Sequence, residues 1–298
     1  MEKLLDFQNK EDQQLLLTLP RVKSWDFPYL YQCQGFWSAS MFLCGIISFQ
    51  KHFQAKDTDI ILATFPKSVY GINQFSILED LHTPRTLATH LPYASLPPFI
   101  ISSGCRIVYL CRNPLDQFIS HWHFAPKIQD QEMTEPILLD DAFEMLRQGV
   151  QYYGPIWEHV LGYWKASLEK PDKILFLKYE DLQEDIISCL KKLANFLGFP
   201  FTDEEETRGV IEEISKFSSF DNMKNLEVNQ TGRLASIAIE NKDFFRKGKV
   251  GDWINHLIKF IFTYFIYIKN LLPEIRDVTS GLMTFKFNQS LSSQRDIE

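Results

Sequence analysis

Five polar residues of this sequence carry groups that could bind an anion or move a proton, and each stands at or just after the end of a short apolar segment. They are Lys67, Ser68, His90, Arg112 and Tyr179. A lysine ammonium and an arginine guanidinium attract phosphate and sulfate groups, and the free N–H groups at a helix start strengthen that attraction. An imidazole can accept a proton near neutral pH. Together these groups indicate phosphoryl or sulfuryl transfer.

Each of these residues also has an ordinary structural explanation. Arg112 could simply end a strand, His90 could be a hydrogen-bonded histidine of the core, and Tyr179 could be a buried aromatic residue. Ser120, further along the chain, could be a small packing residue inside a helix. Taken singly, these explanations are the better ones. The functional interpretation gains because the residues recur at the ends of successive predicted strands.

The elements that must position these residues can be read from apolar segments and helix signals. Short apolar segments predict strands at 59–65, 86–89, 106–111 and 173–178. Helices are predicted at 10–18, at 40–53 with Ser40 as a cap, at 69–81, from 114 to about 124, after a cap at Asp140 and Asp141, at 154–169 and at 179–198. The aromatic stretch 25–37 is predicted to be a loop.

Buried strands that alternate with helices imply an α/β fold, in which a mostly parallel central sheet is flanked by helices. Ligands of such sheets bind beyond the carboxyl ends of the strands, where the five polar residues stand. We expect a single domain over residues 1–298, since no linker or repeat divides the chain.

The composition favours some classes of protein over others. With 45% hydrophobic and 23% charged residues, a packed core is expected, and the net charge of −7 argues against a general nucleic-acid binder. Five cysteines without CxxC or zinc spacing favour a reduced, cytoplasmic protein without a metal site. The charged N-terminus is not expected to be a signal peptide, nor residues 257–272 a membrane span. Oligomeric state is left open.

Longer segments carry a family resemblance. They are LPRVKSWDFPYLYQCQGFW, SFQKHFQAKDTDIILATFPKS, ATHLPYASLPP, CRIVYLCRNPLDQFISHWHF, KYEDLQEDIISCLKKLANFLGFPF, SSFDNMKNLEVN and FFRKGKVGDW, in this order between residues 19 and 253. In these segments the chain resembles the cytosolic sulfotransferases, in particular their plant branch. The motifs CRNP with a later Ser, THLP and RKGxxGDW are specific in combination. The resemblance implies the sulfotransferase fold, which is similar to that of P-loop-containing nucleoside triphosphate hydrolases.

The resemblance also implies a reaction and a site. The donor would be 3′-phosphoadenylyl sulfate, and the acceptor a small hydroxylated molecule such as a phenol, flavonoid or steroid. Lys67 would hold the 5′-phosphate and stabilise the leaving phosphate, and His90 would be the general base. The other residues implied to bind the donor are Ser68, Arg112, Ser120, Tyr179, Ser218, Arg246, Lys247 and Gly248. No metal is implied, because positive side chains and backbone N–H groups can balance the charge.

Two segments depart from the family pattern. The family continues the Lys-Ser pair with Gly-Thr-Thr-Trp and a long helix, whereas this chain continues with Val69, Tyr70, Gly71 and Ile72. Only 22 residues separate Lys67 from His90, far fewer than in the family. Residues 254–298 form a divergent tail. These departures keep a competing hypothesis open, a non-catalytic relative that binds nucleotide or a partner. A P-loop kinase is disfavoured by the absence of a GxxxxGK[ST] motif.

The departure after Ser68 generates a first prediction. A helix is still expected there, but β-branched Val69 keeps the backbone further from a phosphate than Gly does, and about two or three hydroxyl donors of ~1 kcal/mol each are missing. We therefore expect weak or undetectable sulfuryl transfer and reduced nucleotide binding. Inserting Gly-Thr-Thr-Trp and the family's helix after Ser68 should raise the steady-state turnover. Equal turnover with and without the insertion would contradict this reasoning.

Overall fold

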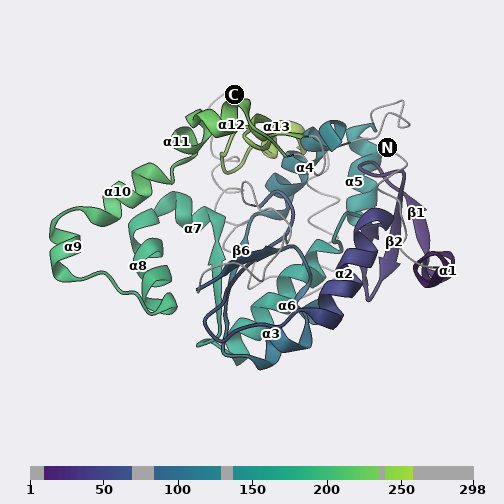
Figure 1. The fold of residues 1–298 in the computed structure, drawn as a ribbon. Coiled ribbons are helices and arrows are strands. Elements are labelled where there is room, and N and C mark those ends of the chain that lie inside the picture. Colours follow the sequence, from purple (N-terminus) through teal and green to yellow (C-terminus); the bar gives the residue numbers. More distant parts are fainter. Residues whose placement is uncertain (1–9, 69–83, 129–136, 235–238, 258–298) are drawn as a thin grey trace, which may run out of the picture.

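The computed structural model describes residues 10–68, 84–128, 137–234 and 239–257 (Figure 1). Its centre is a four-stranded parallel sheet in the order β5-β4-β6-β7. The strands are β4 Ile60–Thr64, β5 Thr86–Thr89, β6 Arg106–Cys111 and β7 Ile174–Lys178. This confirms the predicted α/β class and all four predicted strands, each within a residue of its expected ends.

Both faces of the sheet are covered, which explains why the strands read as continuous apolar runs. On β6, Tyr109 faces the larger core, where its ring stacks on that of Tyr163 at 4.2 Å. The neighbouring residues Val108 and Leu110 face the smaller core on the other side, against Leu193 and Leu197. Successive side chains of β6 therefore point alternately into the two cores, because neighbouring side chains of a strand face opposite sides of the sheet.

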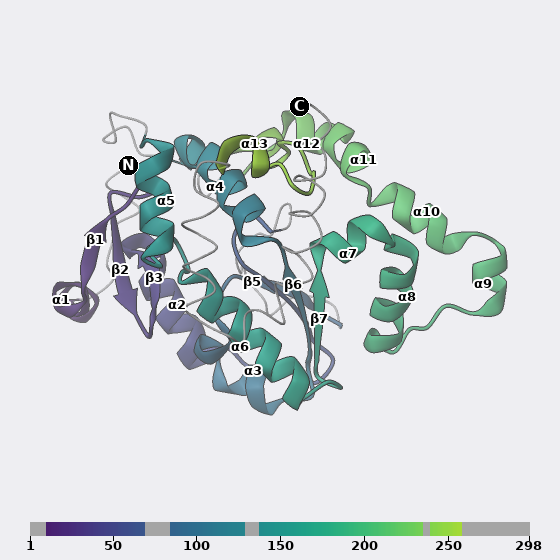
Figure 2. The same ribbon diagram turned by 180° about the vertical axis from the view of Figure 1, so that it is seen from behind.

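Helices surround the sheet, and a short arm of helices projects from the body in both views (Figures 1 and 2). The elements before the arm are α1 Lys10–Thr18, α2 Ser40–His52, η2 Tyr93–Ser95, α3 Pro98–Ser102, α4 Pro114–Ile128, α5 Leu139–Arg147 and α6 Ile156–Glu169. The arm comprises α7 Tyr179–Glu184, α8 Ile186–Leu197, α9 Asp203–Thr207 and α10 Val210–Phe217. Then follow α11 Phe220–Asn225, α12 Glu227–Thr231, β8 Arg233–Leu234, β9 Ile239–Glu240, η3 Asn241–Phe244 and α13 Ile254–Leu257.

The prediction of a loop over residues 25–37 is confirmed for residues 25–28 and wrong for most of the rest. This stretch contains β2 Tyr29–Cys33 and the start of β3 Phe36–Ala39, which form an antiparallel sheet with β1 Arg21–Lys23. Gln34 and Gly35 join β2 and β3 with φ of 52° and 85°, which suits a tight hairpin turn. Phe36 and Trp37 therefore pack onto the core from a strand, whereas Trp25 and Phe27 pack onto it from the segment between β1 and β2.

Three helix predictions need correction. The single helix predicted from Tyr179 to Gly198 is two helices, because Asp185 leaves the helical conformation and its carboxylate accepts a hydrogen bond from the Ser188 N–H, which caps α8. Asp140 and Asp141 lie in the first turn of α5 rather than capping it. Ser40 is the first residue of α2, and its predecessor Ala39 holds the cap position.

Some expectations fall on residues outside the described ranges. They are the helix at 69–81 and nearly all of the apolar stretch 257–272. Among the helices that the structure does describe, none is both long and apolar enough to cross a bilayer.

A buried ion pair joins β4 to the start of β5 and generates a stability prediction. The Asp59 carboxylate accepts the Nε–H of Arg85 at 2.8 Å, and both side chains are at most 5% exposed. Asp59→Ala would remove the buried carboxylate to which Arg85 Nε and Nη2 donate, so we expect the free energy of unfolding to fall by roughly 3–5 kcal/mol in urea titrations. The double variant Asp59→Leu, Arg85→Met should recover most of this loss. A single-variant loss below about 1 kcal/mol would contradict the prediction.

Candidate functional site

Arg112 is the residue that joins the separate segments at the carboxyl edge of the sheet. It follows β6 directly, and its Nη1 and Nη2 donate to the carbonyls of Lys67 and Lys249 at 3.2 and 3.3 Å. Its guanidinium lies over the Tyr179 ring, 4.9 Å from the ring centroid. The ends of β4, β6 and β7 and the RKGxxGDW segment therefore meet around one side chain, as the parallel-sheet argument predicts.

Lys67 lies in the loop after β4 with its ammonium against aromatic rings. Its Nζ is 3.7 Å from the centroid of the Phe124 ring and 5.0 Å from that of Phe244. Burial, together with the positive charges of Arg112 and Arg246, lowers the pKa of Lys67 to about 7, and the nearby Asp243 carboxylate offsets only part of this shift. A bound anion stabilises the charged form of a lysine most when that lysine is desolvated and lies beside other cations.

The loop formed by residues 246–253, which carries RKGKVGDW, is fixed by two carboxylates. Asp252 accepts hydrogen bonds from Arg246 Nη1 at 2.6 Å and from Lys247 Nζ at 2.7 Å. Asp116, in the first turn of α4, accepts the backbone N–H groups of Gly251 and Trp253 at 2.6 and 3.0 Å. The loop and its two cations are thus fastened to the helix that begins next to Arg112.

Gly248 is required by geometry at the centre of this loop. Its φ is +63°, and a Cβ at this position would lie 2.5 Å from the Phe220 ring. Its carbonyl accepts the Tyr179 hydroxyl at 2.8 Å. A larger residue would push the loop away from Tyr179 and therefore from Arg112.

His90 has a defined tautomer. Its Nδ1 lies 2.7 Å from the Thr64 carbonyl, which can only accept, so Nδ1 carries the hydrogen and Nε2 keeps its lone pair. Burial lowers the pKa of His90 to about 4, even though the bond to Thr64 acts to raise it. The ring is therefore neutral at pH 7, with Nε2 able to accept a proton.

Two guanidinium groups retain donors for an anion. The Nε atoms of Arg112 and Arg246 are buried, and neither has a hydrogen-bond partner in the described part of the chain. Buried donors of this kind are normally satisfied. Phosphate oxygens fit the arginine fork, so the residues present suit a phosphorylated nucleotide. Within the described ranges, no group of three or more potential metal ligands occurs.

The three predicted serines differ in placement. Ser68 is buried in the Lys67 loop, and Ser120 is buried in the second turn of α4. Ser218 is exposed at the end of α10, and its hydroxyl donates to the Ile214 carbonyl. Phe220, two residues later, contacts Gly248, so Ser218 lies near the cluster along the chain but its hydroxyl is engaged elsewhere.

Sequence reasoning missed Asp116, Asp252 and Phe124. All three stand inside the quoted motifs CRNPLDQFISHWHF and FFRKGKVGDW, so the motifs marked the right segments. The roles of Asp116 and Phe124 depend on contacts with residues far along the chain, Gly251 and Lys67, and the role of Asp252 depends on how its loop folds back onto Arg246 and Lys247. Periodicity along the chain carries no signal for contacts of that kind.

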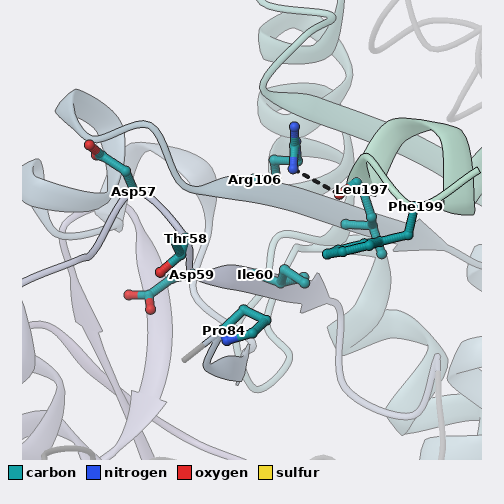
Figure 3. Close-up of a pocket in the computed structure, with 8 residues that line it drawn as sticks. All are labelled: Asp57, Thr58, Asp59, Ile60, Pro84, Arg106, Leu197 and Phe199. Carbon is teal, nitrogen blue, oxygen red and sulfur yellow. Dashed lines mark hydrogen bonds between the residues drawn. The ribbon is translucent and has the colours of Figure 1, made fainter. Parts of the chain in front are cut away.

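A separate hollow of about 230 Å³ lies at the opposite edge of the sheet (Figure 3). Its walls come from the amino ends of β4 and β6 and from the end of α8, and include Asp57, Arg106 and Phe199. None of the predicted site residues lines it. Because ligands of parallel sheets bind at the carboxyl edge, we assign this hollow no part in the chemistry.

A family model and curated relatives match most of this chain. A family model described as the sulfotransferase domain matches residues 69–260. Cytosolic sulfotransferase 15 of Arabidopsis thaliana is 41% identical over 291 aligned positions, which cover 83% of this chain and 80% of that protein. Cytosolic sulfotransferase 14 of the same plant is 40% identical, over 83% of this chain and 84% of that protein. The alignment with cytosolic sulfotransferase 15 has more positions than this chain has residues in it, so the alignment contains gaps in this chain.

A solved structure shares the fold. A mouse sulfotransferase complexed with PAP matches with a TM-score of 0.69 at 24% identity, covering 87% of this chain and 99% of that one. At this identity the likeness concerns the arrangement of the elements.

The lowered pKa of Lys67 generates a prediction on pH dependence. A bound phosphate should raise the pKa of Lys67 above its value of about 7 in the free protein. At a pH between the free and the bound pKa, Lys67 should therefore take up a proton when the nucleotide binds. Affinity for adenosine 3′,5′-bisphosphate should therefore be full below pH 7 and fall by up to about tenfold per pH unit above it. Calorimetry in buffers of different ionisation heat measures this uptake. If Lys67→Met showed the same pH dependence, Lys67 would not be its source.

Proposed function

Because the chain belongs to the plant-type cytosolic sulfotransferase family, whose members transfer sulfuryl groups, we propose that its donor is 3′-phosphoadenylyl sulfate and its acceptor a small hydroxylated molecule. The observation that carries this proposal is the cluster of Lys67, Arg112 and Arg246 at the carboxyl edge of the sheet. Two of these groups hold buried donors without partners in the described chain, and the third is desolvated beside them.

We assign the parts of the donor to the residues that the family resemblance implies. Arg112, Arg246 and Lys247 would bind the 3′-phosphate, and their positive charge suits that role. The buried Ser120 hydroxyl and the backbone at Gly248 complete that set, and Ser218, whose hydroxyl donates to the Ile214 carbonyl, is a further candidate. We assign Tyr179 to the adenine side, since its ring already lies beside Arg112. Lys67 and Ser68 take the 5′-phosphate.

The proposed reaction needs one base and one stabilised leaving group. His90 Nε2 accepts the proton of the acceptor hydroxyl as its oxygen attacks the sulfur. The bond between sulfur and the 5′-phosphate oxygen breaks, and the Lys67 ammonium balances the charge that develops on that phosphate. No step requires a metal ion, since the cluster itself supplies the positive charge.

Further support comes from the relatives. The mouse structure is complexed with PAP, the bisphosphate that remains when 3′-phosphoadenylyl sulfate loses its sulfuryl group. The Arabidopsis relatives are named cytosolic, and we accordingly propose a cytoplasmic location for this chain. The chemical class of the acceptor, whether phenol, flavonoid or steroid, is a matter for a substrate panel.

A matched pair of variants tests the assignment. Arg112→Ala unpairs a desolvated phosphate contact, so affinity for adenosine 3′,5′-bisphosphate should fall by ~2 kcal/mol or more, measured by calorimetric titration. His90→Ala should leave this affinity nearly intact and lower turnover with the labelled donor by about 10²–10⁴-fold.

Each outcome has its own meaning. Unchanged affinity in Arg112→Ala would remove Arg112 from the donor site. Normal turnover in His90→Ala, or much weaker bisphosphate binding, would remove His90 as the general base. Bisphosphate binding without sulfuryl transfer to any phenol, flavonoid or hydroxysteroid, even after the family's segment is inserted, would favour the non-catalytic alternative.

A further inference from the structure

We propose that Gln117 is a positioning residue for donor binding: a buried chain of polar contacts that begins at Asp26 orients its amide, and the amide holds the loop that carries Lys67. The inference rests on the proposed function, since it assigns a role within the same donor site. Gln117 stands in the first turn of α4, and its Nε2 donates to the Pro66 carbonyl at 2.8 Å.

The chain of contacts is continuous and shielded from water. Gln151 Nε2 donates to Gln117 Oε1 at 3.1 Å and to His121 Nδ1 at 3.0 Å. His121 Nε2 faces the Asp26 carboxylate at 3.2 Å. All four side chains are at most 2% exposed. Asp26 lies between β1 and β2, so the chain runs from the N-terminal sheet through α4 to the Lys67 loop.

The direction of each bond fixes the direction of the next. A carboxylate oxygen 3.2 Å from His121 Nε2 favours the tautomer with its hydrogen on Nε2, since a lone pair there would face negative charge; Nδ1 is then left to accept from Gln151. Both hydrogens of the Gln151 amide are then used, one of them on Gln117 Oε1. With its oxygen occupied, Gln117 must present its NH₂ group to the Pro66 carbonyl. The opposite orientation would place two oxygens against each other.

The loop needs such a restraint. Lys67 has φ of +64°, a conformation that is uncommon for a residue with a side chain and persists where its surroundings enforce it. The carbonyls on either side of the Lys67 Cα are held, that of Pro66 by Gln117 and that of Lys67 by Arg112. The Ser68 N–H closes the turn onto the Phe65 carbonyl at 3.1 Å.

Of the two side-chain restraints, Gln117 is the one that a bound donor leaves in place. Arg112 is also assigned to the phosphate, and its bonds to the carbonyls of Lys67 and Lys249 are long, at 3.2 and 3.3 Å. When Arg112 turns its donors to a phosphate, those bonds weaken. Gln117 has no competing partner, because it is buried and its oxygen is occupied. It therefore keeps Lys67 in place while the donor is bound.

The test compares two variants that each lose a bond of the chain. Gln117→Met removes the amide at similar volume, and we expect adenosine 3′,5′-bisphosphate to bind about tenfold more weakly, with the donor KM raised and the acceptor KM unchanged. Ser24→Ala removes a hydroxyl that donates to Asp26 at the far end of the chain. This control should lower the thermal midpoint and leave bisphosphate affinity within about twofold of the wild type.

A third variant supplies a readout that a purely structural role would not change. In Gln117→Glu, the protonated carboxyl can still donate to the Pro66 carbonyl, and the ionised form cannot. Burial raises the pKa of such a glutamate. Between about pH 5.5 and 8.5, the ratio of its bisphosphate Kd to that of the wild type should therefore rise with pH, while the ratio for Gln117→Met stays flat.

The outcomes separate this inference from the proposed function. If the wild type binds bisphosphate and Gln117→Met binds it equally well, the positioning role is wrong. The same holds if the Kd ratio of Gln117→Glu is independent of pH, or if Ser24→Ala weakens binding as much as Gln117→Met. If the wild type itself does not bind bisphosphate, the proposed donor site fails and this role fails with it.

Discussion

Positive charge gathered at one edge of the sheet is the constraint on which the rest of this structure depends. Lys67, Arg112 and Arg246 are close enough that the two arginines lower the pKa of Lys67. The carboxylates nearby offset only part of this charge: Asp252 binds Arg246 and Lys247, and Asp116 binds the backbone of the 246–253 loop. Like charges that are partly desolvated repel each other, so the arrangement is most favourable when an anion is bound.

The scaffold explains how distant segments can hold that charge. Parallel strands end at one edge, which brings the residues after β4, β5, β6 and β7 together, and α4 starts from the same edge with Asp116 and Gln117 in its first turn. One helix therefore fastens the Lys67 loop on one side and the 246–253 loop on the other. His90 joins the same edge through its bond to the Thr64 carbonyl, one strand away.

The sequence predicted the parts of the structure that depend on local pattern. All four strands and the start of α4 at Pro114 follow from apolar runs and helix signals. The hairpin at Gln34-Gly35 was missed because aromatic residues there do not alternate clearly with polar ones. The roles of Asp116 and Gln117 were missed because their partners lie far along the chain. The residues that we propose for the donor site come from motifs, and the contacts that hold them required the fold.

The central claim, that this edge binds a nucleotide with a 3′-phosphate, is tested most directly by comparing two ligands on the wild-type chain. Calorimetric titration with adenosine 3′,5′-bisphosphate and with adenosine 5′-monophosphate, at one pH and ionic strength, isolates the 3′-phosphate. With Arg112, Arg246 and Lys247 around that group, the bisphosphate should bind at least about tenfold more tightly, a difference of ~1.4 kcal/mol. Equal affinities, or no binding of either nucleotide, would contradict this account.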